Sequence, residues 1–238
     1  MLGRFLEVSV RAPDILESLA FYETLGFVQA RVGDTRPYSY AIVTDGRFCL
    51  GLHACEFDSP SLTWVHADLA VHASMLESLG IELDFSRLSE DAFHELGFRD
   101  PSGQLVTLIE ARTWSSPPAG ELRPSSLGYF EEYGVPVTDV ARAAAFWDSL
   151  GFIAFEPECV PFTRVVASHR DLNVGLYETD LRRPVLTFSD PQMPERIAAL
   201  RDLGHRMPDR LPRGMDPREN ALLEAPEGTW LLLTTDAD

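Results

Sequence analysis

The sequence contains no lysine, because all 20 of its basic residues are arginines. Schiff-base chemistry and a lysine nucleophile or general base are therefore excluded. Cysteine is also scarce, and the three cysteines form neither a metal-type cluster nor a disulfide framework. No apolar run approaches the roughly 20 residues that a helix needs to span a bilayer.

Positive charge is in deficit, since the 238 residues carry a formal net charge of −17. Contacts with phosphate groups need a basic face, so we expect neither nucleic acid nor an anionic membrane surface as a partner. Glycine-rich phosphate loops and spacings typical of nucleophilic triads are lacking as well. The N-terminal residues have no apolar region of the signal-peptide kind, and we therefore expect a cytoplasmic protein.

One short segment occurs twice in similar form. Residues 20–27 are AFYETLGF, and residues 145–152 are AFWDSLGF. The correspondence continues at an offset of 124 or 125 positions, and it relates Asp14 to Asp139 and Gly103 to Gly228. Repeats of this length indicate duplicated structural units. Residues 113–126 are rich in proline, serine and glycine, which predicts a linker between a domain at 1–112 and a domain at 127–238.

Each half divides again into two units, which begin with a strand-like stretch and continue with a helix and further strands. Residues 4–10 alternate as a strand does, and Asp14 is placed to cap a helix that ends at Gly26. The stretch 92–98 resembles the repeated phrase but leads straight into a turn, so we expect a strand there. The four expected units are residues 4–57, 60–112, 127–180 and 184–235.

Four such units, with FYxxLGF ending the first helix and DPxG preceding a last strand, resemble the vicinal-oxygen-chelate superfamily. Its members include glyoxalase I, extradiol dioxygenases and bleomycin-binding proteins. The resemblance implies an α+β fold in which four βαβββ modules form two glyoxalase-like half-open barrels with helices on the outside. Four units in one chain remove the need to pair sheets between chains, so both a monomer and a homodimer stay possible.

Metal-using members of that superfamily carry ligands on the first and last strands of each unit, where the ion acts as a Lewis acid. By resemblance, the positions to compare are Glu7, Ser61, Thr107, Glu132, Val185 and Leu232. At these positions each barrel has at most one carboxylate, whereas a zinc or iron site requires three or four protein ligands. We therefore expect no metal and no other cofactor, with a divalent metal on atypical ligands as the fallback.

Strand alternation indicates which side chains face the interior of each barrel. With Glu7 inward, the apolar residues of its strand face the helix layer, and a one-residue slip would exchange the two faces. Apolar walls with a few polar groups are typical of a small-molecule pocket. The predicted pocket residues are Phe5, Glu7, Ser9, Ser61, Thr63 and Thr107 in the first barrel and Phe130, Glu132, Thr187, Ser189 and Trp230 in the second.

Glu7 and Glu132 are the candidate catalytic bases, since burial would raise the pKa of each carboxyl group. The alternative is a solvated carboxylate at an open barrel mouth, or a remnant of lost metal binding. The six histidines are scattered along the chain, and His53 is the one best placed to line a pocket rim.

The sequence therefore favours metal-independent binding of a small molecule, of the sequestration or resistance type. Whether the protein also catalyses a reaction stays open at this stage. Two alternatives stand beside this interpretation. One is a divalent-metal-dependent lyase, isomerase or dioxygenase with atypical ligands, and the other is an interaction protein whose pockets are vestigial.

Overall fold

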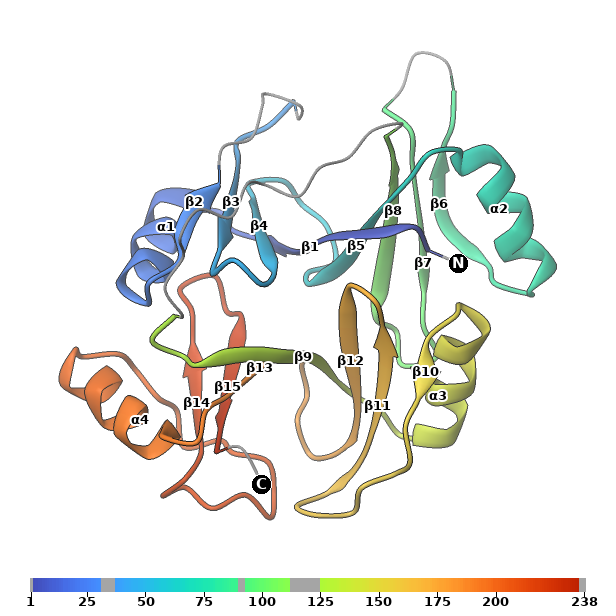
Figure 1. The fold of residues 1–238 in the computed structure, drawn as a ribbon. Helices are drawn as coiled ribbons and strands as arrows, with labels where there is room; N and C mark the ends of the chain where they lie inside the picture. The colour runs from blue at the N-terminus through green and yellow to red at the C-terminus, as the bar shows by residue number, and fades with distance from the viewer. Residues whose placement is uncertain (1, 31–36, 90–92, 112–124, 236–238) are drawn as a thin grey trace.

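The computed structural model describes residues 2–30, 37–89, 93–111 and 125–235. Within these ranges the chain forms two open β-sheets and four α-helices (Figure 1). Most of the expected linker at 113–126 lies outside the described residues, and the division into two domains stays a prediction. None of the described helices has the length and apolar character needed to cross a bilayer.

The first sheet has eight strands and is built from two consecutive βαβββ units. In chain order its strands are β1 (Arg4–Arg11), β2 (Val28–Ala30), β3 (Tyr40–Thr44), β4 (Cys49–His53), β5 (Ser61–His66), β6 (Leu83–Arg87), β7 (Glu95–Arg99) and β8 (Leu105–Glu110). Helix α1 (Ile15–Thr24) follows β1, and helix α2 (Leu69–Ser78) follows β5. Across the sheet the order is β2-β3-β4-β1-β5-β8-β7-β6, so β1 and β5 are antiparallel neighbours at its centre.

The second sheet repeats this arrangement with seven strands in the order β10-β11-β12-β9-β13-β15-β14. They are β9 (Tyr129–Pro136), β10 (Ile153–Ala154), β11 (Thr163–His169), β12 (Leu172–Glu178), β13 (Val185–Ser189), β14 (Ala221–Glu224) and β15 (Trp230–Thr234). Helix α3 (Val140–Ser149) follows β9, and helix α4 (Met193–Asp202) follows β13. The central pair, β9 and β13, is again antiparallel.

The two sheets lie one above the other in Figure 1, with the four helices at the outer corners. One hydrophobic core contains residues of both halves. In it Phe48 stacks on Phe130 with ring centroids 4.1 Å apart, and Trp64 meets Phe152 edge-on at 6.4 Å. The face of each sheet that points away from this shared core is called here the first cradle, on the first sheet, and the second cradle, on the second.

Helix starts and stops follow the local chemistry that the sequence indicates. Asp14 and Asp139 each accept a hydrogen bond from a backbone N–H group of the first helical turn, at 3.0 and 2.9 Å. Gly26 and Gly151 follow the helix ends with φ of +90° and +93°, a conformation that glycine adopts without strain. The predicted cap at Asp14 and the predicted stop at Gly26 are confirmed.

The α+β class and the four-unit architecture are confirmed, with one difference in the fourth unit. After α4 the chain forms two strands, β14 and β15, where three were expected. Residues 205–220 connect α4 to β14 without a strand, and they contain Pro208, Pro212 and Pro217. Proline cannot donate a ladder hydrogen bond, so this segment is a poor strand. Residues 95–98 of the stretch that was expected to be a strand lie in β7, and residue 92 lies outside the described residues.

Both first strands contain a β-bulge at the equivalent position of the repeat. In β1 the register shifts between Phe5 and Glu7, and in β9 the shift leaves Glu131 as the extra residue. One extra residue reverses the alternation of side chains. Phe5 and Phe130, which we expected beside the glutamates in the pockets, therefore belong to the shared core instead.

Candidate functional site

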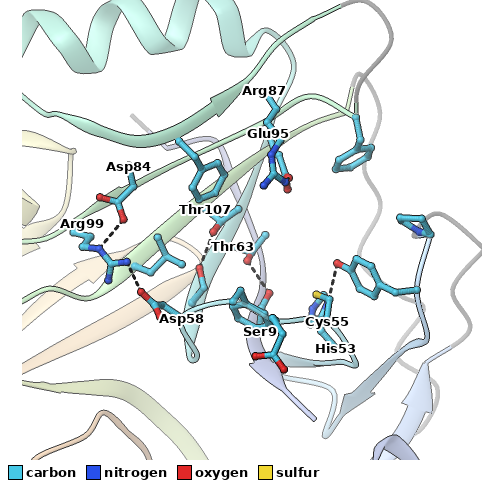
Figure 2. Close-up of a pocket in the computed structure, with 18 residues that line it drawn as sticks. Ser9, His53, Cys55, Asp58, Thr63, Asp84, Arg87, Glu95, Arg99 and Thr107 are labelled. Carbon is cyan, nitrogen blue, oxygen red and sulfur yellow. Dashed lines mark hydrogen bonds and ion pairs between the residues drawn. The ribbon is translucent and has the colours of Figure 1, made fainter. Parts of the chain in front are cut away.

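The first cradle contains a cavity of about 550 Å³ (Figure 2). A row of hydroxyl side chains from β1, β5 and β8 lines one side of the cavity: Ser9, Ser61, Thr63 and Thr107. Aromatic rings line other parts of its wall: Tyr38, Phe57, Phe85 and Phe93. The cavity thus combines apolar surface with a short polar row.

Glu7 lies behind the hydroxyl row and is fully buried. Its Oε1 accepts a hydrogen bond from Ser9 Oγ at 2.9 Å and lies 2.8 Å from Nε2 of His53, while its Oε2 accepts from the Tyr40 hydroxyl at 2.7 Å. Burial alone would raise the pKa of Glu7, but the hydrogen bonds from His53, Tyr40 and Ser9 hold it below its ordinary value. Glu7 is therefore a buried carboxylate.

His53 connects this carboxylate to the cavity. It is the last residue of β4 and lines the cavity, and its Nδ1 lies 3.3 Å from the hydroxyl of Tyr38. Its ring centroid lies 4.6 Å from that of Tyr40 and 5.7 Å from that of Phe57. Because Nε2 donates to a carboxylate, the neutral ring keeps its lone pair on Nδ1.

The directions of the hydroxyl hydrogen bonds follow from Glu7. Ser9 donates its only proton to Glu7, so in its 2.7 Å contact with Thr63 it must accept. Thr63 therefore presents lone pairs to the cavity. Ser61 and Thr107 share one hydrogen bond of 2.8 Å, which uses one of their two protons and leaves the other for a bound molecule.

Both arginines that line the cavity are paired with acidic residues of the same lining. Arg99 contacts Asp58 and Asp84, each at 2.6 Å, and Arg87 pairs with Glu95 (Figure 2). Such partly exposed ion pairs contribute little to stability. Because both arginines already have acidic partners, this cavity offers little positive charge to an anionic ligand.

The second cradle contains a cavity of about 560 Å³ and a second buried glutamate, Glu132. Its Oε1 accepts from the Tyr177 hydroxyl at 2.5 Å and lies 3.3 Å from Arg164 Nη1, whereas its Oε2 has no partner within the described part of the chain. Burial raises the pKa of Glu132 to about 7; Arg164 and Tyr177 oppose this rise, and Glu131 and Glu158 add to it. The two glutamates are thus shifted in opposite directions.

An apolar cluster occupies part of the second cradle. Its members are Phe162, Tyr177, Leu181, Val185, Leu211, Met215, Leu222, Trp230 and Leu232. Leu211 and Met215 come from the irregular segment at 205–220, which therefore covers this cradle where the fourth unit lacks a strand.

The two cradles are copies that surround the glutamate with different partners. The repeat relates His53 to Tyr177 and Tyr40 to Arg164, so equivalent strands supply the donors. Sequence reasoning missed Tyr40, Arg164 and Tyr177. One signal was present, because a glycine lies two residues before both His53 and Tyr177.

The structure distributes the predicted pocket residues over several environments. Ser9, Ser61, Thr63 and Thr107 line the first cavity, Thr187 lines the second, and Glu7 and Glu132 are buried. The remaining four line neither of these two cavities: Phe5, Phe130, Ser189 and Trp230.

Each of these four has a physical reason for its place. The β-bulges turn Phe5 and Phe130 into the core, where Phe5 meets Trp64 at 5.0 Å. Ser189 ends β13 where the backbone of Gly128 approaches it closely. Trp230 packs in the apolar cluster of the second cradle, with the guanidinium of an arginine 5.3 Å from its ring centroid.

The described residues of the two cradles do not supply the donor set of a metal site. Among the described residues, no group of three or more His, Cys, Asp or Glu side chains could hold an ion. Both oxygens of Glu7 already receive hydrogen bonds from the chain itself, and its neighbours in the row are hydroxyls. The residues present do not fit a divalent ion, which wants three or four nitrogen, sulfur or carboxylate ligands.

No model of a known protein family matches the sequence, and no curated protein matches it. Solved structures do match the fold over almost the whole chain. A catechol 2,3-dioxygenase superimposes with a TM-score of 0.64 at 14% identity, over 99% of this chain and 88% of that one. The 2,2',3-trihydroxybiphenyl 1,2-dioxygenase of Sphingomonas wittichii strain RW1 gives 0.62 at 17% identity, over 99% and 91%.

An extradiol ring-cleaving dioxygenase from B. fuscum gives a TM-score of 0.63 at 15% identity, over 100% of this chain and 72% of its own. At this level of identity the likeness concerns the fold. The fold that the resemblance implied is confirmed.

Proposed function

We propose that the protein binds a small molecule in the first cradle without a metal ion. The observation that carries this proposal is the cavity of about 550 Å³, in which aromatic walls face a row of hydroxyl groups. Pockets of roughly 300–1,000 Å³ with apolar walls and a few placed polar groups are typical of small-molecule sites.

The lining indicates a class of ligand. Four aromatic rings favour a planar, largely apolar molecule, which they contact edge-on or by stacking. Thr63 can accept a hydrogen bond from it, and the Ser61–Thr107 pair can donate one. The paired arginines of the cavity lining favour a neutral molecule over an anion.

The solved structures of similar fold are consistent with an aromatic ligand, since their names refer to catechol and to trihydroxybiphenyl. A metal-dependent reaction, which was one alternative, would need a donor set that the described residues do not supply. Binding by sequestration therefore has better support than a metal-dependent lyase, isomerase or dioxygenase activity.

The test is a binding titration with the neutral fluorescent aromatic probe 6-propionyl-2-(dimethylamino)naphthalene, together with native mass spectrometry of the purified chain. Thr107→Phe, which fills the first cavity, should abolish binding of the probe and of any co-purified molecule. Thr235→Phe places the same ring at the second cavity and should leave binding unchanged. Equal binding by Thr107→Phe, or a requirement for a stoichiometric metal ion, would contradict the proposal.

A further inference from the structure

We infer that His53 acts as a general base that removes a proton from the molecule bound in the first cradle, with Glu7 as its positioning residue. This inference rests on the proposed function, because it requires a ligand in the first cavity. It replaces Glu7 as the candidate base, since Glu7 is fully buried and His53 is the member of the pair that lines the cavity.

The first support is the way in which the carboxylate is held. Glu7 receives hydrogen bonds from Ser9 on its own strand and from Tyr40 on β3, in addition to the one from His53 on β4. Donors on three strands leave its carboxylate little freedom to rotate. A carboxylate so fixed orients the imidazole and selects the tautomer in which Nε2 carries the proton.

The second support is the atom that the imidazole presents. With the proton on Nε2, the lone pair is on Nδ1, and the nearest described partner of Nδ1 is the Tyr38 hydroxyl at 3.3 Å. Hydrogen bonds between nitrogen and oxygen atoms in proteins are usually shorter, at about 2.7–3.2 Å. The Tyr38 contact is therefore one that an acidic group of a ligand can replace.

The proton transfer balances within the site. A bond between hydrogen and the ligand breaks, the proton forms a bond to Nδ1, and the electron pair stays on the ligand. The imidazolium so formed lies 2.8 Å from the Glu7 carboxylate, which stabilises its charge. The Ser61–Thr107 pair has one hydroxyl proton that is not used between the two residues. It can donate a hydrogen bond to the negative charge that develops on the ligand. No further reactant is required.

The second cradle provides a natural comparison. There Tyr177 stands in place of His53, and burial raises its pKa well above the ordinary value, with Glu132 adding to the rise. A phenol held in its neutral form cannot take up a proton at neutral pH. The two copies therefore differ in this chemistry, and Thr235→Phe, which fills the second cavity, is the control for conversion there.

The probe for the experiment is nitrobenzisoxazole, a neutral planar molecule. A base removes its carbon-bound proton, the electron pair forms a nitrile, and the nitrogen–oxygen bond breaks to leave a coloured phenolate. Wild-type protein should convert it with saturation kinetics. His53→Gln and Glu7→Gln should each lower kcat by about 100-fold or more, with KM changed less than about tenfold. Thr235→Phe should retain the wild-type kcat.

Binding of the probe is measured separately by equilibrium dialysis, with Thr107→Phe as the blocked-cavity variant. Failure of the probe to bind in the first cavity overturns the proposed function and this inference together. Binding with no conversion above the buffer rate, or unchanged conversion by His53→Gln, overturns the role of His53 alone.

Circular dichroism checks that each variant folds. If His53→Gln does not fold, wild-type protein is treated with diethyl pyrocarbonate, which acylates histidine. Loss of conversion, prevented by prior binding of the same neutral naphthalene probe, is the expected result. Conversion that survives complete acylation of His53, verified by peptide mass, overturns the inference.

Discussion

A Cβ atom on Gly51 would lie 2.4 Å from the carboxyl carbon of Glu7. The second cradle repeats this relationship, because a Cβ on Gly175 would lie 2.6 Å from Oε1 of Glu132. Neither glycine has a positive φ, so the requirement is for space and not for an unusual backbone conformation. In both halves the strand beside the glutamate lacks a side chain where the carboxylate lies.

Gly51→Ala should therefore displace the Glu7 carboxylate and disturb its three donors. We expect a loss of about 1–3 kcal/mol in the free energy of unfolding, as for other overpacked interiors, measured by urea denaturation. The variant should also lose binding of the aromatic probe. Gly175→Ala should lose similar stability but keep probe binding. Wild-type stability in Gly51→Ala would show that the space beside the Glu7 carboxylate accommodates a methyl group.

Glu7→Gln should be less stable than wild type at neutral pH. The folded-state pKa of Glu7 lies below its ordinary value of 4.5, so the ionised group contributes stability above that value and loses it as pH falls through the folded pKa. Disruption of its hydrogen bonds should cost about 1–3 kcal/mol at neutral pH. Urea denaturation as a function of pH should show the difference shrinking below about pH 4.5; a difference independent of pH would argue against an ionised Glu7.

For Glu132→Gln, the stability relative to wild type should change with pH in the opposite direction to that of Glu7→Gln. The pKa of Glu132 is raised from 4.5 to about 7, so the folded protein retains a proton that the unfolded chain releases in this range. Wild-type stability therefore falls as pH rises from 4.5 to about 7, and the variant escapes this loss. At about 1.4 kcal/mol per pKa unit, its stability relative to wild type should improve by about 3 kcal/mol over that range. Parallel stability curves for the two proteins would contradict the raised pKa.

Phe5→Ala should destabilise the fold without affecting the ligand site. The ring of Phe5 is buried against Trp64, and removal of a buried phenylalanine costs about 3–5 kcal/mol. The contrasting variant is Phe57→Ala, which removes a half-buried ring from the wall of the first cavity. It should weaken binding of the aromatic probe with a smaller loss of stability. Weaker binding in Phe5→Ala at unchanged stability would place this ring in the cavity.

Much of the architecture could be predicted because it depends on local signals. The repeated phrase identified the halves, and an aspartate before the helix with a glycine after it located α1 and α3. Alternation placed Ser9 and Thr63 on the same face as Glu7, and both line the first cavity. The three prolines at 205–220 were also visible in the sequence, and they account for the strand that the fourth unit lacks.

The placement of Phe5 and Phe130 and the contact of Tyr40 with Glu7 could not be predicted, because they depend on contacts that no short stretch of sequence reveals. A β-bulge adds one residue to an otherwise regular pattern, which is why Phe5 and Phe130 were assigned to the wrong face. The adjacent acidic residues Glu131 and Glu132 were the only local sign of it. Tyr40 reaches Glu7 from a strand that is separated from β1 by β4, and only the pairing of the sheet brings the two together.

The extra residue in β1 and the extra residue in β9 occupy the same place in the repeat. Two independent insertions at one position are far less economical than a single one copied by gene duplication. A single duplication that copied an existing bulge would account for both halves, in which the residue beside the buried acid now differs: histidine in the first and tyrosine in the second.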